Sequence, residues 1–436
     1  MSALRRLSGG ASRETWSFDL EASGTGRQTR GLILRRDPPG APSDAMVKEA
    51  ALLAVAADAG VPVPSVVAKG DAGSELGCPF VVTERLDGET IPRRILRDDA
   101  YAAARAGLAA QCGTVLARLH AAPPDSVSGL ADSDQLAQYR QVLDGIGQPS
   151  APFELAFRWL EQRRPERTRT AIVHGDFRHG NLLVGGDGLR AVLDWELAHL
   201  GDPIEDLGWL CVKSWRFGSP QPVGGFGSYD DLIAAYEAAG GGPVDRAALR
   251  WWEVLGNLKW GIMCMLQART HTTGRVRSVE LAAIGRRVPE VEWDLLALTA
   301  PPPPSESAEG WSRLGSESDP KRLQQLHGVP DMGGLVEAVR EFLEGDVMGA
   351  TEGRVQFHTR VAVNVLRMVE RELELGGDQA SRYRQGLEAL GFDNEADLAS
   401  AIRAGDVEGS IHDVAAFVTE TVRARLQVAN PRYLEP

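Results

Sequence analysis

The segment that most constrains the fold is residues 172–194, where two short apolar runs each lead into polar side chains. IVHGDFRHGN places two histidines, an aspartate and an asparagine directly after an apolar strand, and LRAVLDW brings a later strand to Asp194. The strand NLLV and this later strand are joined by GGDG, a turn sequence. We therefore expect a hairpin that brings Asn181 and Asp194 close together.

Three interpretations of this cluster are open from the residues alone. A transition-metal site would use His174, Asp176 and His179, but their HxDxxH spacing has no matching ligand pair elsewhere in the chain. A polar turn accounts for one or two of the residues. Phosphoryl transfer accounts for more, because it requires a carboxylate that accepts the hydroxyl proton and oxygen ligands for Mg²⁺. In that interpretation Asp176 is the base, and Asn181 and Asp194 are the metal ligands, in the order of a kinase catalytic loop.

HGDFRHGN matches the HGDxxxxN signature of the aminoglycoside phosphotransferase and choline kinase superfamily, and VLDWE and GDPIEDLGWL resemble its next segments. The combined pattern is especially similar to the phosphotransferase-like domain fused to some acyl-CoA dehydrogenases. The resemblance covers residues 1–300. It implies an α+β, bilobal protein-kinase-like fold with a small β-rich N-lobe and a larger helical C-lobe.

The resemblance also implies roles for individual residues. Asp176 would be the catalytic base, and Asn181 and Asp194 would bind Mg²⁺. Three side chains would support this loop or its ligands: His174, Glu196 and Asp206.

The N-terminal region contains candidate residues for ATP binding. LSGGASRETW precedes the first long strand, as the family's Gly-rich loop does, and its residues Gly9, Gly10 and Ser12 suit close approach to phosphate. Arg35 takes the place of the family's strand lysine, with Glu49 as its partner. VVTERLDG fits the segment that pairs with adenine through its main chain, at Glu84, Arg85 and Leu86. A Walker-type GxxxxGK[ST] loop is absent from the sequence.

We expect four segments along the chain: an N-lobe for the nucleotide over 1–86, a C-lobe with the catalytic loop, metal and substrate sites over 87–300, a Pro/Ser-rich linker over 301–320, and an all-α C-terminal domain over 321–436. The N-lobe should contain a hairpin over 14–36 and a helix from Ser43 to Gly60. The last domain resembles an uncharacterised helical domain appended to such phosphotransferases. One of its helices carries a stripe that favours a salt-bridged face over an anion site: Arg360, Asn364, Arg367 and Arg371.

Composition limits the partners and the compartment. The net charge of -13 argues against nonspecific binding to nucleic acid or to an anionic membrane. The first ten residues lack the apolar core of a signal peptide, and apolar runs stay shorter than the ~18 residues of a membrane span. The cysteines lie far apart, which is typical of reduced thiols and a cytoplasmic protein: Cys78, Cys112, Cys211 and Cys264.

These patterns predict an ATP- and Mg²⁺-dependent small-molecule kinase that transfers the γ-phosphoryl group to a substrate hydroxyl. The alternatives are an aminoglycoside or choline-like amino-alcohol kinase, a pseudokinase that serves as a nucleotide-binding or scaffold module, and a metallohydrolase. The resemblance to domains joined to acyl-CoA dehydrogenases implies a hydroxyacyl acceptor, whose chain would lie near Trp209, Trp215 and Trp260. The C-terminal domain would hold a protein partner or mediate self-association.

Limited proteolysis tests the predicted linker. The first cuts should fall between Pro301 and Pro320, because this Pro/Ser/Glu-rich stretch has little apolar surface to bury. Mass spectrometry of the earliest fragments locates the cuts. Preferential cleavage inside either predicted domain would contradict the boundary.

Overall fold

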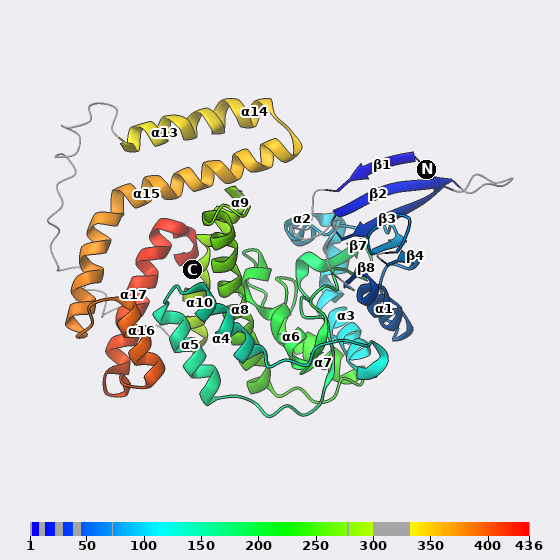
Figure 1. Ribbon diagram of the computed structural model, residues 1–436, viewed down its shortest axis with the longest axis horizontal. Coiled ribbons are helices and arrows are strands. Elements are labelled where there is room, and N and C mark those ends of the chain that lie inside the picture. Colours follow the sequence, from blue (N-terminus) through cyan, green and yellow to red (C-terminus); the bar gives the residue numbers. More distant parts are fainter. Residues whose placement is uncertain are drawn as a thin grey trace. The chain divides into compact units, whose positions relative to one another are not determined.

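The chain forms two compact units. The computed structural model describes residues 2–7, 14–21, 29–37, 45–71, 73–276, 279–299 and 332–435 (Figure 1). The first unit contains Met1–Asp134 and Arg164–Gly256, and the second contains Gln135–Arg163 and Asn257–Pro436. Helix α8, Arg246–Thr272, contributes to both units.

The first unit opens with a five-stranded antiparallel sheet in the order β1-β2-β3-β5-β4 (Figure 1). Its strands are β1 Ser2–Arg6, β2 Glu14–Glu21, β3 Thr29–Arg36, β4 Val66–Gly70 and β5 Phe80–Glu84. The predicted hairpin is confirmed, because β2 and β3 pair in register from Glu14 opposite Arg36 to Glu21 opposite Thr29. Its connection, 22–28, lies outside the described residues.

Helix α1, Ala45–Asp58, follows the hairpin as predicted and buries Met46, Leu53 and Ala56. It stops shortly before Gly60, and the Val61 N–H donates to the Ala56 carbonyl at 2.9 Å. The predicted cap, Ser43, lies outside the described residues.

The rest of the first unit is helical except for two small antiparallel sheets, β6-β9 and β7-β8. The strands are β6 Ala171–Val173, β7 Leu182–Gly185, β8 Gly188–Val192 and β9 His199–Gly201. The helices are α2 Pro92–Arg97, α3 Ala102–His120, α6 Ile204–Cys211 and α7 Tyr229–Ala238, with short 3-10 turns η1 Asp99–Tyr101, η2 Pro124–Ser126, η3 His179–Asn181 and η4 Lys213–Arg216. The predicted catalytic hairpin is therefore present, with Leu182 opposite Val192.

The core of this unit forms around α3. Leu108, Cys112 and Leu116 are fully buried and lie at the spacing of one helical face. Helix α7 packs against α3 so closely that a Cβ on Gly113 would collide with the Leu232 carbonyl. This core also includes Leu182 and Val192, so it anchors the catalytic hairpin to α3.

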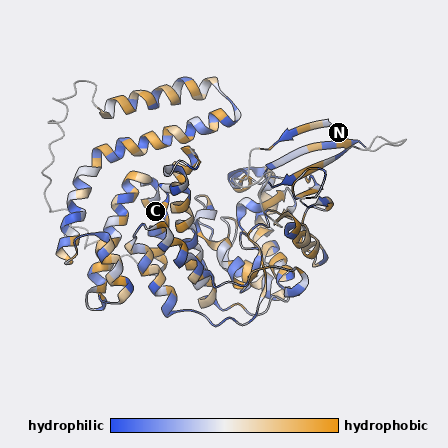
Figure 2. Ribbon diagram, in the orientation of Figure 1, coloured by the Kyte–Doolittle hydropathy of each residue, from blue (hydrophilic) through white to orange (hydrophobic). Residues whose placement is uncertain are grey.

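The second unit is all-helical apart from turns. Its helices are α4 Gln135–Ile146, α5 Ala151–Gln162, α9 Val279–Gly285, α10 Val288–Thr299, α13 Met332–Phe342, α14 Met348–Ala350, α15 Gly353–Ala389, α16 Glu395–Ala404 and α17 Ile411–Ala429. The π-turn η6 Leu343–Val347 joins α13 to α14, and the 3-10 turns η7 Glu408–Ser410 and η8 Pro431–Leu434 flank α17. Apolar and polar residues alternate along these helices (Figure 2), and the apolar ones form a core that includes Leu398, Val414 and Phe417.

The predicted C-lobe, 87–300, contributes residues to both compact units, since 135–163 and 257–299 cluster with the C-terminal helices. The predicted linker 301–320 lies outside the described residues. The division of the chain at this linker stays a prediction.

Candidate active site

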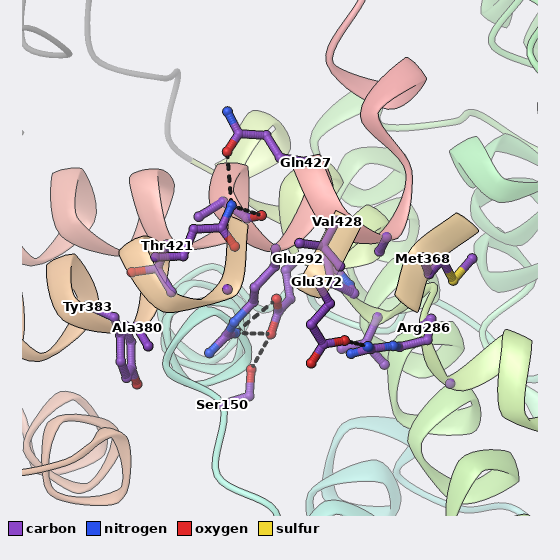
Figure 3. Close-up of a pocket in the computed structure, with 18 of the residues that line it drawn as sticks. Ser150, Arg286, Glu292, Met368, Glu372, Ala380, Tyr383, Thr421, Gln427 and Val428 are labelled. Atoms are coloured by element: carbon purple, nitrogen blue, oxygen red, sulfur yellow. Dashed lines mark hydrogen bonds and ion pairs between the residues drawn. The ribbon is translucent and has the colours of Figure 1, made fainter. Parts of the chain in front are cut away.

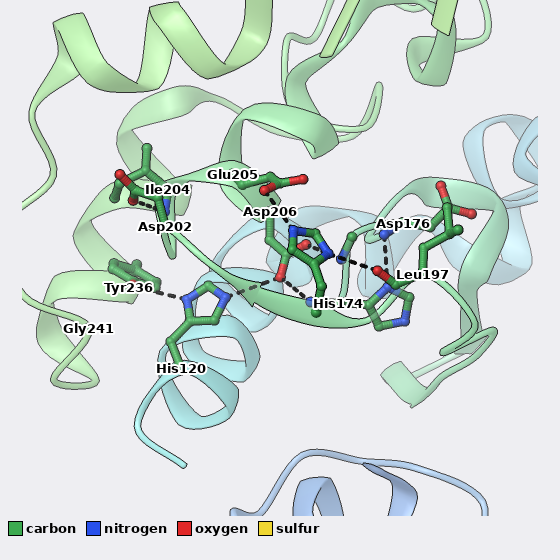
Figure 4. Close-up of polar contacts among 12 residues, drawn as sticks. His120, His174, Asp176, Leu197, Asp202, Ile204, Glu205, Asp206, Tyr236 and Gly241 are labelled. Atoms are coloured by element: carbon green, nitrogen blue, oxygen red, sulfur yellow. Dashed lines mark hydrogen bonds and ion pairs between the residues drawn. The ribbon is translucent and has the colours of Figure 1, made fainter. Parts of the chain in front are cut away.

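The loop after β6 is held by the buried carboxylate of Asp206, near the start of α6 (Figure 4). Asp206 accepts the N–H of His174 at 2.8 Å and the N–H of Gly175 at 2.9 Å. Gly175 has a φ of +76°, and a Cβ there would collide with the Leu197 carbonyl. A carboxylate and a glycine thus define the turn that presents Asp176.

A chain of hydrogen bonds from Arg169 through Tyr236 and His120 ends at Asp206 (Figure 4). Arg169 Nη2 donates to the Tyr236 hydroxyl at 2.9 Å, which lies 3.1 Å from His120 Nδ1. His120 ends α3, and its Nε2 lies 3.1 Å from Asp206 Oδ2. Burial alone would raise the pKa of the Asp206 carboxyl, but the hydrogen bonds from His120 and from the His174 main-chain N–H hold that pKa below its usual value. Asp206 is therefore held as a carboxylate.

His174 braces the loop with both ring nitrogens. Its Nδ1 accepts the N–H of Asp176 at 3.2 Å, so Nε2 carries the proton and donates to the Leu193 carbonyl at 3.1 Å. Burial lowers the pKa of His174, which favours this neutral form. The ring also lies 4.6 Å from that of Trp195. Since neither nitrogen is left for a metal, the transition-metal interpretation loses its first ligand.

The His179 ring has an Nε2 without a hydrogen-bond partner among the described residues, but aromatic rings pack against it. Its ring is buried, its Nδ1 lies 2.7 Å from the Gly224 carbonyl, and burial lowers its pKa to about 4. It packs edge-on against Phe217 and Phe226. Among the described residues, no group of three or more histidine, cysteine or acidic side chains is placed so that it could hold a metal ion.

Asp176 lies at the end of the loop and receives hydrogen bonds from three side chains. Asn181 Nδ2 donates to Oδ2 at 2.7 Å and to the Asp176 carbonyl at 3.0 Å. Trp209 Nε1 donates to Oδ1 at 2.9 Å. Arg178 Nε lies 3.0 and 3.2 Å from the two carboxylate oxygens. Because the side-chain amide nitrogen of Asn181 faces Asp176, the side-chain oxygen of Asn181 is the atom that could ligate a cation.

Asp194 lies beside Asn181, as the predicted hairpin requires. The Leu193 N–H donates to the Asn181 carbonyl at 2.9 Å. Asp194 has a φ of +67°, a left-handed conformation that aspartate tolerates better than most residues. Its Oδ1 receives Arg35 Nη2 at 2.9 Å, while Arg35 Nη1 pairs with the buried Glu49. Arg35 on β3 therefore links the helix α1 to the loop after β8.

The remaining predicted nucleotide residues are only partly described. Gly9, Gly10 and Ser12 lie outside the described residues. Glu84 and Arg85 donate their main-chain N–H groups to the carbonyls of Ser65 and Gly31. The Arg85 side chain pairs with Asp19 at 2.8 Å. Adenine pairing therefore stays a prediction that depends on Leu86 and on main-chain carbonyls in this stretch.

Glu196 is exposed, two residues after Asp194. Burial lowers the pKa of Arg35, but the charges of Glu49, Asp194 and, to a smaller extent, Glu196 raise that pKa above its usual value. Glu196 therefore lies in the electrostatic environment of the site, as the sequence suggested, and its role as a metal or substrate ligand stays a prediction.

Trp209 is the contact that sequence reasoning missed. From the sequence we expect Trp209 and Trp215 near an acyl chain, but both rings are buried and their centroids lie 5.3 Å apart. Arg178 stacks over Trp215, with its Cζ 4.9 Å from the ring centroid. A signal was available, because Trp209 follows Asp206 by three residues and therefore shares its face of α6. Trp260 belongs to the second unit.

A pocket of about 470 Å³ adjoins this loop in the first unit. It lies between the α2–α3 region and residues 217–226, and its walls include Phe217 and Phe226, the rings that pack on His179. Its charged lining residues are Arg97 and Arg105, without an acidic side chain among the described lining residues. The pocket therefore suits an anionic or neutral molecule better than a cation.

A larger cavity, about 840 Å³, lies in the second unit (Figure 3). Its polar groups bond to one another. Arg425 Nη1 lies 3.1 Å from both carboxylate oxygens of the buried Glu292, and Glu292 also accepts a hydrogen bond from the Ser150 hydroxyl at 3.0 Å. Arg286 forms an ion pair with Glu372. The predicted catalytic and nucleotide residues are absent from its described lining.

Comparison with known proteins identifies the class of the first unit. The phosphotransferase enzyme family matches residues 3–252, and a domain of unknown function (DUF6285) matches residues 349–433. The first match covers more than half of the chain, so the chain belongs to the phosphotransferase enzyme family.

The curated relatives include acyl-CoA dehydrogenase family member 10 of Mus musculus, which is 32% identical over 219 residues, 46% of this chain and 20% of that protein. Acyl-CoA dehydrogenase family member 11 of Homo sapiens is 26% identical over 230 residues, 47% of this chain and 29% of that protein. The matches thus span less than a third of these relatives.

Solved structures show the fold. A Ralstonia eutropha protein assigned to the aminoglycoside phosphotransferases superposes with a TM-score of 0.53 at 20% identity, over 68% of this chain and 92% of that one. A variant of aminoglycoside 2'-phosphotransferase IIIa in complex with GDP gives a TM-score of 0.52 at 16% identity, over 68% and 94%. The predicted bilobal kinase-like fold is therefore confirmed. Among the described helices, none has the length and apolarity of a membrane span.

Replacement of Asp206 by Asn should destabilise the protein by about 3–5 kcal/mol, because it breaks a buried, charged hydrogen-bond network. Since the pKa of Asp206 is lower in the folded state, its contribution is complete above its unfolded pKa of about 4 and is lost as the pH falls through the folded value. Thermal unfolding followed by circular dichroism at pH 7 and at acidic pH measures both effects. The exposed Asp230→Asn is the control, and equal melting midpoints for the two variants at pH 7 would contradict the assignment.

Proposed function

We propose that the chain is an ATP- and Mg²⁺-dependent small-molecule kinase that transfers the γ-phosphoryl group to a substrate hydroxyl. The observation that carries this proposal is the arrangement of Asp176, Asn181 and Asp194. One carboxylate is held by three side-chain donors, and the amide and second carboxylate of the neighbouring hairpin lie beside it. This arrangement supplies a base and two oxygen ligands in one place.

In the proposed reaction Asp176 accepts the proton of the acceptor hydroxyl. The hydroxyl oxygen forms a bond to the γ-phosphorus, and the bond from that phosphorus to the bridging oxygen of ATP breaks, which releases ADP. Asn181 and Trp209 keep the Asp176 carboxylate in a fixed orientation through the hydrogen bonds at 2.7 and 2.9 Å. A positioned base of this kind contributes about 10²–10⁴-fold to a rate.

The residues present fit a Mg²⁺–nucleotide complex. Asn181 and Asp194 offer hard oxygen atoms, the ligands that Mg²⁺ prefers. Bound Mg²⁺ would neutralise negative charge on the phosphates. Arg35 is held between Glu49 and Asp194, and its guanidinium suits contact with phosphate oxygens.

A pseudokinase would have the same kinase-like fold but would not transfer a phosphoryl group. The intact Asp176, Asn181 and Asp194, together with the fully bonded support of their loop through Asp206, favour an active enzyme.

For the acceptor, we propose a hydroxyacyl compound that carries a negative charge, in preference to an aminoglycoside. Arg178 lies on Asp176, and Arg97 and Arg105 line the adjoining pocket, so a polycation would meet like charges there. The relatives named for acyl-CoA dehydrogenases support the same class by analogy.

Replacement of Asp176 by Asn should retain nucleotide binding and lower kcat by about 10²-fold or more, because the amide cannot accept the proton. Asp194→Ala should instead weaken the Mg²⁺-dependent affinity for ATP, because a charged oxygen ligand is lost. Coupled-enzyme assays with ATP and with GTP measure turnover, and calorimetry measures nucleotide affinity.

Asp187→Asn, in the exposed turn between β7 and β8, is the matched control for both variants and should behave like the wild type. If the Asp176 and Asp194 variants both turned over like the wild type, the assignment of the site would be wrong. Nucleotide binding without turnover by the wild type on any acceptor would favour the pseudokinase.

A side-by-side kinase assay tests the acceptor class with kanamycin-type aminoglycosides, choline-like alcohols and hydroxyacyl thioesters. We expect transfer to the hydroxyacyl thioester. Arg97→Gln should raise its KM severalfold without changing the KM for ATP, because Arg97 lines the pocket. Arg93→Gln, also exposed on α2 but outside that lining, is the control. Efficient phosphorylation of aminoglycosides alone would reverse the preference.

A further inference from the structure

The second unit contains a helical hairpin whose two sides differ in chemistry. One arm runs continuously through α13, η6 and α14, residues 332–350, and the other is the first half of α15 (Figure 1). The arms pack against each other along their length. Three half-buried residues of the first arm lie at helical spacing with Arg340: Val336, Leu343 and Val347. Arg340 donates to Glu370 of α15 at 2.7 Å. This row of the first arm therefore faces α15.

One side of the hairpin is charged. Arg367 of α15 donates to Glu344 of the first arm at 2.6 Å. Glu337 and Glu341 lie on the same side of the first arm, since they precede Glu344 by seven and three residues. On α15 the predicted stripe of Arg360, Asn364, Arg367 and Arg371 also falls there. Arg367 thus forms the ion pair that the sequence favours for this stripe, whereas Arg371 donates to the Val428 carbonyl of α17 at 2.7 Å.

The other side of the hairpin is apolar and exposed. On α13, four side chains at spacings of three, four and three are 63%, 56%, 52% and 57% exposed: Met332, Leu335, Val339 and Phe342. The helical positions around this row are occupied by Gly334, Ala338, Gly345 and Gly349, with Asp346 as the one charged residue. On α15 the side turned away from Arg367 carries Val355, Ala362 and Leu366, and Val355 is also more than half exposed. We refer to these apolar residues of both arms as the apolar face.

We propose that the apolar face is the contact surface for a second copy of this chain, and that two hairpins form a four-helix bundle. A 3-4-3 spacing of apolar residues is the seam that a helix presents to another helix. The face is two helices wide, so it matches a partner that also presents two antiparallel helices of the same length, which a second copy does under two-fold symmetry.

The size of the face is sufficient for such a contact. Nineteen helical residues span roughly 28 Å, and two helices are roughly 20 Å wide, so each copy would cover roughly 560 Å². The pair would bury roughly 1,100 Å², just above the ~1,000 Å² of a specific interface. Small residues beside the row would let the helices approach closely, and the salt-bridged side would remain in solvent.

The test compares two double variants of the same helix in the full chain. Leu335→Gln with Val339→Gln changes the apolar face, and Glu337→Gln with Glu341→Gln changes the charged side. Analytical ultracentrifugation should show a dimer for the wild type and the control, and a dimerisation constant weakened at least about tenfold for the first variant. Circular dichroism verifies that both variants keep their helices, and kinase or nucleotide-binding assays should be unchanged.

Cysteine cross-linking gives a second readout that does not depend on stability. The four native cysteines are buried, so an introduced surface cysteine reports its own surroundings. Val339→Cys should form a disulfide between two chains on mild oxidation, whereas Glu341→Cys should not. A wild type that stays monomeric at high concentration would overturn the proposal and leave another protein or a membrane as the partner of this face. Equal dimerisation of both double variants would overturn it as well.

Discussion

The hydrogen bonds to the Asp206 carboxylate are the interaction on which the candidate active site depends. They hold the His174 and Gly175 amides, and through them the turn that presents Asp176. A buried carboxylate remains charged only where donors surround it, and here the donors are two main-chain amides and His120. His120 is itself bonded to Tyr236, so the last turn of α3 and helix α7 both support the loop. The position of Asp176, the proposed base, thus results from packing between helices distant in sequence.

Arg35 plays the corresponding structural role for the part of the site that we propose binds the nucleotide. It belongs to the sheet, yet it pairs with Glu49 of α1 and with Asp194 at the end of the catalytic hairpin. One guanidinium therefore joins three elements that move independently in the unfolded chain. Its planar fork can hold two carboxylates at once, which a lysine ammonium does less specifically. Arg35, which stands in place of the family's strand lysine, can therefore make the same pairing with the two carboxylates of Glu49 and Asp194.

The surroundings of Asp176 combine positive charge with aromatic rings. Arg178 and the paired rings of Trp209 and Trp215 place a cation and two aromatic side chains at the base, and the adjoining pocket adds Arg97 and Arg105. Family membership defines the class of reaction but not its acceptor, because the acceptor is selected by such local charge and shape. The C-terminal hairpin is a separate feature of the second unit, with its own apolar surface.

The sequence by itself determined the local order of the site. Alternating apolar runs, a GGDG turn and the spacing of Asp176, Asn181 and Asp194 predict the loop and hairpin, because such patterns depend on neighbours within a few residues. Helix α1 and the β2-β3 hairpin follow for the same reason. Only the tertiary structure decided that Trp209 donates to Asp176, that Arg35 bonds Asp194 directly, and that 135–163 clusters with the C-terminal helices. The first two contacts join residues 33 and 159 positions apart, and which distant side chains meet is decided by the packing of whole helices and sheets.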